Sequence, residues 1–376
     1  MLLVLGAAPG IAPISFAQGS GQGSVPAAQP PDQNQDQGGP AVDNGPMVIP
    51  KKKEPTDNTP PPAPAEPKVK NPNGETYSLR VDVPIVTLDV NVILDKNHQF
   101  VPGLKAQNFL VLEDGVEQKV DTVRVTQTPI TAVMLLEFAA NSWYVINDMQ
   151  NAAVSFFRSL HPQDYIAVMT YDLRTHILCD FTNNQQVIAQ SLMSLTIPTF
   201  SDTDMFDALY ETLDRSSRIP GRKYIILIGT GRDTFSKINL DKMLAKIKAT
   251  PNVTIFTIGT GALLHQFDNG GIRELDYLQA QNQLKTFASM TGGLSFSPIF
   301  QGELADDFAQ INNSIRNQYV LTYRPSNTKN DGGYRKVKVM LVDNEGHPLQ
   351  MQDEKGKPLK YSVISRDGYN AKLPVE

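Results

Sequence analysis

Apolar and polar residues alternate in two stretches of the chain, and continuous apolar runs lie between them. The first stretch runs from Tyr77 to Leu94, with shorter alternating runs at 109–113 and 120–125. A period of two is typical of strands that bury one face. We therefore predict that residues 76–128 form the first part of a β module, which is too small to bury a core alone.

Between residues 129 and 316 the pattern changes to alternating strands and helices. Continuous apolar runs, which are typical of strands buried on both faces, lie at 131–136, 165–170, 224–229 and 253–259. Helical patterns lie near 144–160, 185–195, 205–218, 240–248, 275–290 and 303–317. This alternation predicts an α/β domain with a doubly wound, mostly parallel, Rossmann-like sheet.

The strand pattern returns in residues 317–376. Alternating runs lie at 319–323, 335–341 and 361–364. Neither flanking fragment has enough strands to bury a face by itself. We therefore expect both fragments to form one small β-sandwich-like module, with the α/β domain inserted into it.

The amino-terminal segment favours export to the periplasm, the cell envelope or the outside. Residues 1–18 hold the apolar run Leu2–Ala8 and, before Gln18, the small residues Ser15 and Ala17 that a signal peptidase accepts. The missing basic residues at its start favour a truncated signal peptide. Residues 19–75 are rich in Pro, Gly and Gln and predict a disordered linker. No other stretch approaches the roughly 20 apolar residues of a membrane span.

Composition argues against several classes of function. The net charge of -5 supplies no basic field for nucleic acid. The single cysteine, Cys179, cannot form a disulfide or a cysteine-rich metal site within one chain. The Gly-Thr-Gly runs at 229–231 and 259–261 lack the rest of a phosphate-binding motif and predict tight turns. No nucleophile elbow or paired histidines occur, so we expect no enzyme.

The order of these elements and several short motifs together resemble the von Willebrand factor A-like proteins, most closely their acidobacterial branch. The resemblance spans residues 81–369 and is specific through the order and spacing of its motifs. These are Phe109–Gly115, the strand ending at Glu137, His161–Asp164, Phe181–Thr182, Thr203–Leu209, Thr291–Gly293 and Arg366–Tyr369.

The resemblance implies a place for a divalent cation, usually Mg²⁺, at the carboxyl edge of the sheet. In that family three loops supply Asp-x-Ser-x-Ser, a threonine and an aspartate. Here Glu137, Ala139 and Asn141 stand at the three positions of the first loop. Thr203 matches the threonine, and Thr230 stands where the aspartate is expected.

These departures predict a degenerate adhesion site. Mg²⁺ requires near-octahedral oxygen ligands, so we expect no cofactor, with Glu137, Asn141 and Thr203 as the only weak candidates for a residual site. Arg232 and Asp233 follow Thr230 closely, and we expect the guanidinium of Arg232 to pair with Glu137 in place of a cation.

Further residues border this predicted site. Ser142, Trp143 and Tyr144 follow the first loop, and the aromatic pair predicts either partner anchors or core packing. Asp204, or Thr203 beside it, is expected to cap the following helix, with an acidic calcium loop as the alternative.

The sequence thus predicts an exported, non-enzymatic binding protein whose partner is another protein or a cell-surface component. Two alternatives stay open. One is a structural envelope protein without a specific ligand, and the other is an enzyme or transport-associated factor that uses the same cleft.

Overall fold

The computed structural model describes residues 68–70, 76–78, 84–126, 129–195, 198, 200–265 and 274–373. The predicted signal peptide and nearly all of the predicted linker lie outside these residues. Within the linker range, however, β1 (Lys68–Lys70) pairs antiparallel with β2 (Thr76–Ser78). A short strand therefore lies in a segment for which the composition predicts no regular structure.

The α/β domain is built on a six-stranded sheet with the order β12-β11-β10-β7-β8-β9. The strands are β7 (Thr131–Glu137), β8 (Tyr165–Tyr171), β9 (Thr175–Thr182), β10 (Lys223–Gly229), β11 (Val253–Gly259) and β12 (Ser295–Phe296). All neighbours pair parallel except β8 and β9, which pair antiparallel. The connection between those two strands is only residues 172–174, too short for a parallel crossover. The doubly wound, mostly parallel fold is confirmed.

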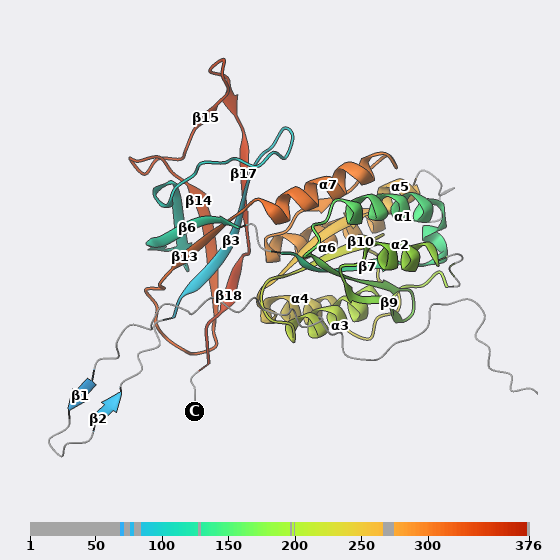
Figure 1. Ribbon diagram of the computed structural model, residues 1–376, viewed down its shortest axis with the longest axis horizontal. Coiled ribbons are helices and arrows are strands. Elements are labelled where there is room, and N and C mark those ends of the chain that lie inside the picture. Colours follow the sequence, from blue (N-terminus) through green and yellow to red (C-terminus); the bar gives the residue numbers. More distant parts are fainter. Residues whose placement is uncertain are drawn as a thin grey trace, which may run out of the picture. The chain divides into compact units, whose positions relative to one another are not determined.

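Helices cover both faces of this sheet. One face packs against α1 (Trp143–Arg158), α2 (Gln185–Met193), α5 (Gly261–His265) and α7 (Glu303–Arg316), and the other against α3 (Met205–Ser217), α4 (Leu240–Ala249) and α6 (Glu274–Thr291). Figure 1 shows α1 and α7 on one side of β7 and β10, and α3 and α4 on the other. The short helix α5 was not predicted, because Gly259-Thr260-Gly261 reads as a turn.

The apolar runs of the central strands supply both cores. In β7, Met134 packs into one core and its neighbour Leu135 into the other, and both are fully buried. In β10, Ile226 and Leu227 divide in the same way. Successive side chains of a strand point to opposite faces, so a strand covered by helices on both sides is apolar throughout.

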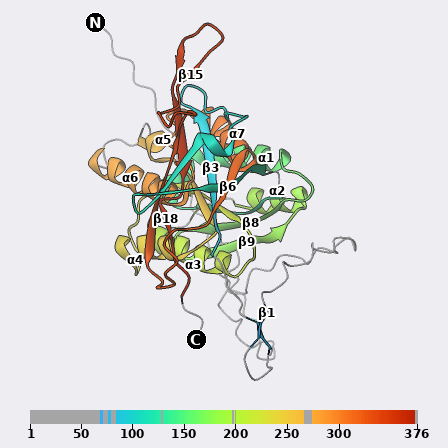
Figure 2. The same ribbon diagram turned by 90° about the vertical axis from the view of Figure 1, so that its left-hand side faces the viewer.

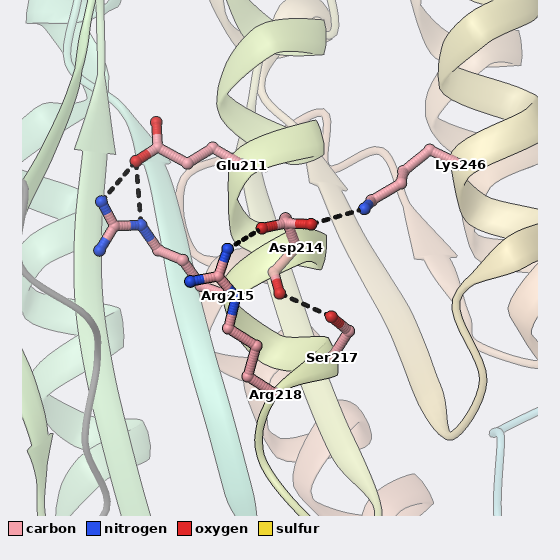
Figure 3. A network of polar contacts seen from close by, with 6 residues as sticks. All are labelled: Glu211, Asp214, Arg215, Ser217, Arg218 and Lys246. Carbon is pink, nitrogen blue, oxygen red and sulfur yellow. Dashed lines mark hydrogen bonds and ion pairs between the residues drawn. The ribbon is translucent and has the colours of Figure 1, made fainter.

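Polar contacts join α3 and α4 at the surface. Lys246 Nζ of α4 lies 2.9 Å from Asp214 Oδ1 of α3, and Arg218 lies 2.6 Å from the other oxygen of the same carboxylate. One turn earlier, Arg215 and Glu211 form a further ion pair of 2.6 Å. Figure 3 shows this network, with Lys246 reaching from α4 to Asp214 on α3.

The segments on either side of the α/β domain form one β module of two sheets. The sheet orders are β17-β3-β13-β6 and β18-β14-β4-β5. The strands are β3 (Val86–Leu94), β4 (Phe109–Glu113), β5 (Val116–Gln118), β6 (Val120–Thr126), β13 (Gln318–Tyr323), β14 (Tyr334–Leu341), β17 (Tyr361–Ser365) and β18 (Gly368–Asn370). The 3-10 helix η1 (Ala106–Asn108) precedes β4.

Strand pairing between the two segments explains why neither fragment needs a core of its own. β13 pairs with both β3 and β6, and β14 pairs with β4. The shared core includes Leu88, Val111 and Leu321, all with no exposed surface. The predicted module from flanking segments is confirmed.

Turns and one hairpin complete the module. At the predicted Asp114-Gly115 turn both residues have positive φ, 49° and 85°, as a type I′ hairpin turn requires. The hairpin of β15 (Met351–Gln352) and β16 (Pro358–Leu359) extends beyond β3 and β6, as Figures 1 and 2 both show at β15. Among the described residues, no helix has the length and apolar character needed to cross a membrane.

Candidate binding site at the carboxyl edge of the sheet

The sheet has a topological switch point between β7 and β10. From β7 the chain continues to β8 on one side, and from β10 it continues to β11 on the other. In open α/β sheets the loops at such a point diverge and leave a crevice in which ligands bind. Glu137 and Gly229 are the last residues of the two strands and lie at this point.

Glu137 is only 1% exposed, and neutral donors surround its carboxyl group. Its Oε2 accepts hydrogen bonds from the backbone N–H of Thr230 at 2.6 Å and from the Thr230 hydroxyl at 2.8 Å. The Tyr171 hydroxyl donates to the same oxygen at 3.4 Å, and the Ser142 hydroxyl donates to Oε1 at 3.0 Å. Both oxygens of Glu137 are therefore occupied within the protein.

Gly229 makes room for this buried side chain. A Cβ atom at Gly229 would lie 2.6 Å from Glu137 Oε2 and 2.5 Å from the Tyr171 hydroxyl oxygen. Both distances are shorter than a non-bonded contact allows, so a larger residue would displace Glu137 or Tyr171. The close packing of β7, β8 and β10 at this edge depends on that glycine.

Burial also determines the titration of this group. Removal from water raises the pKa of Glu137, and the hydrogen bonds from Thr230, Ser142 and Tyr171 oppose that rise. Burial raises the pKa of Tyr171 as well, and the nearby Glu137 carboxylate adds to the effect. Tyr171 thus stays a neutral donor at physiological pH.

The second and third loops of the predicted site bind each other. The Thr203 hydroxyl donates to the carbonyl of Arg232 at 2.9 Å, and the Thr203 backbone N–H donates to the Thr234 hydroxyl at 2.9 Å. The carbonyl of Thr203 accepts from the N–H groups of Thr234 and Phe235, both at 3.0 Å. Thr203 is therefore used to join two loops.

The third loop also caps helix α3, which corrects the expectation for Asp204 and Thr203. Asp233 Oδ1 accepts the backbone N–H of Phe206 at 3.0 Å, and the Ser236 hydroxyl accepts that of Asp207 at 3.1 Å. Asp204 is the first residue before the helix, but its side chain makes no capping hydrogen bond. The free N–H groups at a helix start donate to any well-placed oxygen, and here a loop distant in sequence supplies the oxygens.

Asp204 is instead a buried acid close to other acids. It is 7% exposed, and within the described part of the chain its Oδ1 has no hydrogen-bond partner. Burial raises its pKa to about 8, and Asp207, Asp172 and Asp233 add repulsion. Asp172, which follows β8, was not predicted as a neighbour because it comes from a different loop.

The first loop differs from the expected ion-pair arrangement. Within the described contacts, the guanidinium of Arg232 makes no ion pair with Glu137, and Thr230 and Ser142 provide the donors instead. The described residues also contain no group of three or more His, Cys, Asp or Glu side chains arranged to hold a metal ion. Glu137 and Thr203 both use their oxygens in protein hydrogen bonds, so these residues fit Mg²⁺ poorly.

The rim of the edge carries exposed aromatic residues. Ala139 and Ser142 are fully buried, whereas Tyr144 is 62% exposed at the start of α1. Phe200, 48% exposed, is held beside the first loop because the N–H of Ala140 donates to its carbonyl at 2.7 Å. Phe235, in the third loop, is 65% exposed. The side chains of Asn141 and Trp143, both candidates from the sequence, lie outside the described part of the structure.

A cavity of about 300 Å³ lies beside Thr230 at the same edge. Gly259, Tyr277 and Ser297 line it, and Leu278 and Ile299, about half exposed, lie at its border. The edge therefore has a fixed polar centre at Glu137 and an apolar surface around it.

Tyr171 carried no recognisable signal in the sequence, and Gly229 was interpreted only as part of a tight turn. Tyr171 and Gly229 end β8 and β10, and the parallel register places both beside Glu137. Their roles depend on which strands are neighbours, so only the strand order could have revealed them.

No protein-family model matches the sequence, and no curated protein matches it either. Solved structures do show similarity. They include a von Willebrand factor type A protein from Catenulispora acidiphila, with a TM-score of 0.40, 11% identity, and coverage of 77% of this chain and 75% of that chain.

Two further similar structures come from pili. The vWF domain of the type V pili tip protein Mfa5 from Porphyromonas gingivalis has a TM-score of 0.39 and 15% identity, with 50% of this chain and 96% of that chain covered. The PilB minor pilin from Streptococcus sanguinis has a TM-score of 0.38 and 10% identity, with 51% and 62% covered. The match thus spans less than two thirds of that pilin.

Proposed function

We propose that this chain is an exported, non-enzymatic binding protein that contacts a protein or surface partner through the carboxyl edge of its α/β sheet, without a metal ion. The observation that carries the proposal is the environment of Glu137. Its four hydrogen bonds come from within the protein. A partner carboxylate bridged by a cation would need these oxygens, so recognition falls to the surrounding surface.

That surface has the composition of a binding site. Tyr144, Phe200 and Phe235 expose 62%, 48% and 65% of their area, and all three lie on loops or helix starts at one edge of the sheet. Aromatic residues are enriched among those that dominate the binding energy of interfaces. The cavity beside Thr230 offers a place for one apolar partner side chain.

The partner can be tested by capture from an envelope extract with the full chain, in buffer with EDTA. We expect a specific protein or glycan to bind, and binding to fall about tenfold or more in Tyr144→Ala or Phe235→Ala, because central aromatic anchors contribute most affinity. Val116→Ala is the matched control, since Val116 is 56% exposed on β5 of the module. Equal loss in all three variants would contradict the proposed surface.

Metal independence has a separate test. Thermal unfolding of the full chain should give the same midpoint with EDTA and with millimolar Mg²⁺, because a ligand raises the midpoint only if it binds the folded state. A saturable rise with Mg²⁺ that Thr203→Ala removes and Thr203→Ser keeps would show a working metal site and overturn this part.

A further inference from the structure

A second cavity, of about 420 Å³, lies far from the carboxyl edge and is bordered by strands of the β module and the end of α4. Four cationic side chains line it: Lys248, Lys329, Arg366 and Lys372. No aspartate or glutamate is among its lining residues, although the whole chain has a net charge of -5. The cavity is therefore a local concentration of positive charge on an acidic protein.

Arg366 is the unusual member of this set. It is half-buried, its Nε is buried without a hydrogen-bond partner, and within the described residues it forms no ion pair. The charge of Asp89 acts on Arg366, but Asp89 forms its ion pair with Arg222, at 2.7 Å. A guanidinium that is partly withdrawn from water and shares its only nearby counter-charge with another arginine is less favourable than one that pairs directly with a ligand anion.

The backbone fixes Arg366 in this position. A Cβ atom at Gly292 would lie 2.7 Å from the Arg366 backbone nitrogen, so α6 ends in direct contact with this segment. The next residue, Asp367, donates its N–H to the carbonyl of Met290 at 3.2 Å. The end of α6 thus contacts the backbone at Arg366 and at the next residue, Asp367, and fixes the position of both.

The other charges around the cavity leave it cationic. Lys248 Nζ lies 5.5 Å from the centre of the Tyr334 ring, and its charge opposes the rise that burial causes in the pKa of Asp367. Asp367 lines the neighbouring cavity rather than this one. Asp331 is engaged by Arg335 at 2.8 Å.

The opposite wall is apolar. Pro84, Ile85, Pro251 and Pro325 line it, and Ile85 is 61% exposed. A volume of this size is within the range of small-molecule sites, which combine an apolar wall with a few polar groups that orient the ligand. The cavity therefore matches a molecule with an anionic end and an apolar body.

We propose that this cavity binds a small organic anion, with its phosphate or carboxylate group on Arg366 and Lys248 and its apolar body against the proline-rich wall. Arginine pairs with both anions through two parallel N–H donors, and a ligand would give the buried Nε side of Arg366 the partner it lacks. This function is separate from the carboxyl-edge surface, so either proposal can fail alone.

Calorimetric titration of the full chain with phenyl phosphate tests the proposal. We expect saturable binding, weaker binding of inorganic phosphate, and none of phenol. Arg366→Gln should weaken phenyl phosphate binding about tenfold or more, the usual loss when a charged hydrogen bond is removed. Without ligand, the same substitution should change the melting midpoint little, because Arg366 is half-buried and forms no ion pair among the described residues.

Lys248→Gln provides a second variant in case Arg366→Gln folds poorly, and it should weaken binding to a smaller extent. Lys96→Gln is the control, with the same change of charge at an exposed turn that does not line the cavity. Unchanged binding in both cavity variants, or equal weakening in the control, would overturn the site. Equal binding of inorganic phosphate and phenyl phosphate would overturn the role of the apolar wall.

Discussion

Two buried carboxyl groups of the α/β domain lie in opposite surroundings. Glu137 ends β7 and accepts hydrogen bonds from three residues, whereas Asp307 of α7 has an Oδ2 that is buried without a partner in the described structure. They are 1% and 7% exposed. Burial raises the pKa of Asp307 to about 7, and Glu303 and Asp306 add repulsion. The hydrogen-bond donors around a buried acid, more than its depth of burial, therefore determine whether the acid stabilises the fold.

The largest expected effect comes from filling the space beside Glu137. Gly229→Ala should lower the free energy of unfolding by about 3 kcal/mol or more, because the new Cβ would overlap Glu137 and Tyr171. Urea unfolding followed by circular dichroism measures this. Gly302→Ala is the control, with nothing within 4 Å of the added atom, and should change stability by less than about 1 kcal/mol. Equal effects would contradict the packing argument.

The next effect tests the donors around Glu137 directly. Glu137→Gln keeps the shape but replaces one acceptor oxygen with an NH2 group, so the donors of either Thr230 or Ser142 lose their acceptor. We expect a loss of about 2 kcal/mol at pH 7, the usual cost of a buried unsatisfied group. Glu211→Gln, at a carboxylate whose side chain is 41% exposed, should lose less than about 1 kcal/mol. A neutral Glu137→Gln would mean that these hydrogen bonds add no stability.

Asp307→Asn should have the opposite sign and depend on pH. The folded pKa, about 7, is above the ordinary value of 3.8, so the stability that the neutral acid gives is complete below about pH 4 and lost as pH rises through 7. The variant should match the wild type at pH 4 and exceed it by about 1 to 3 kcal/mol at pH 8. Thermal melts between pH 4 and 8 measure this. Asp306→Asn, on the exposed side of the same turn, removes one of the repelling charges and should therefore reduce that slope without abolishing it.

The smallest effect belongs to charges at the surface. Lys246→Gln removes the contact with Asp214 and the position over the Tyr210 ring, 4.6 Å from its centre. Asp214 is 40% exposed, so we expect a loss of about 0.5 kcal/mol that shrinks further in 1 M salt. Urea midpoints at two salt concentrations provide the comparison, and a loss as large as that of Glu137→Gln would reverse the order proposed here.

The sequence predicted the architecture because the relevant signals are local. Apolar runs such as Ile225–Ile228 are unfavourable in water and must be buried. Their alternation with amphipathic helices favours a doubly wound sheet, in which helices cover both faces. The antiparallel pairing of β9 was not evident, because His176–Phe181 has the same composition as a parallel strand. The length of the β8–β9 connection decides it.

The site was harder to predict because its contacts join residues far apart in sequence. Thr230 was expected to mark a lost carboxylate, but its role as a double donor to Glu137 depends on β7 and β10 being neighbours. Arg232 was expected at Glu137 because of its charge. A neutral threonine at the end of the adjacent strand fills that place, and no one-dimensional pattern distinguishes the two outcomes.

The insertion of the α/β domain has a mechanical consequence. The chain leaves the β module at the end of β6 and re-enters it at β13, where Thr126 and Gln318 are register partners. Tension applied through β3 and β18 would therefore first load the hydrogen bonds between β3 and β17, the strand directly before β18, and would reach the inserted domain only after β6 and β13 had also separated. While those ladders hold, a pulled molecule keeps its α/β sheet and the loops at its carboxyl edge unstrained.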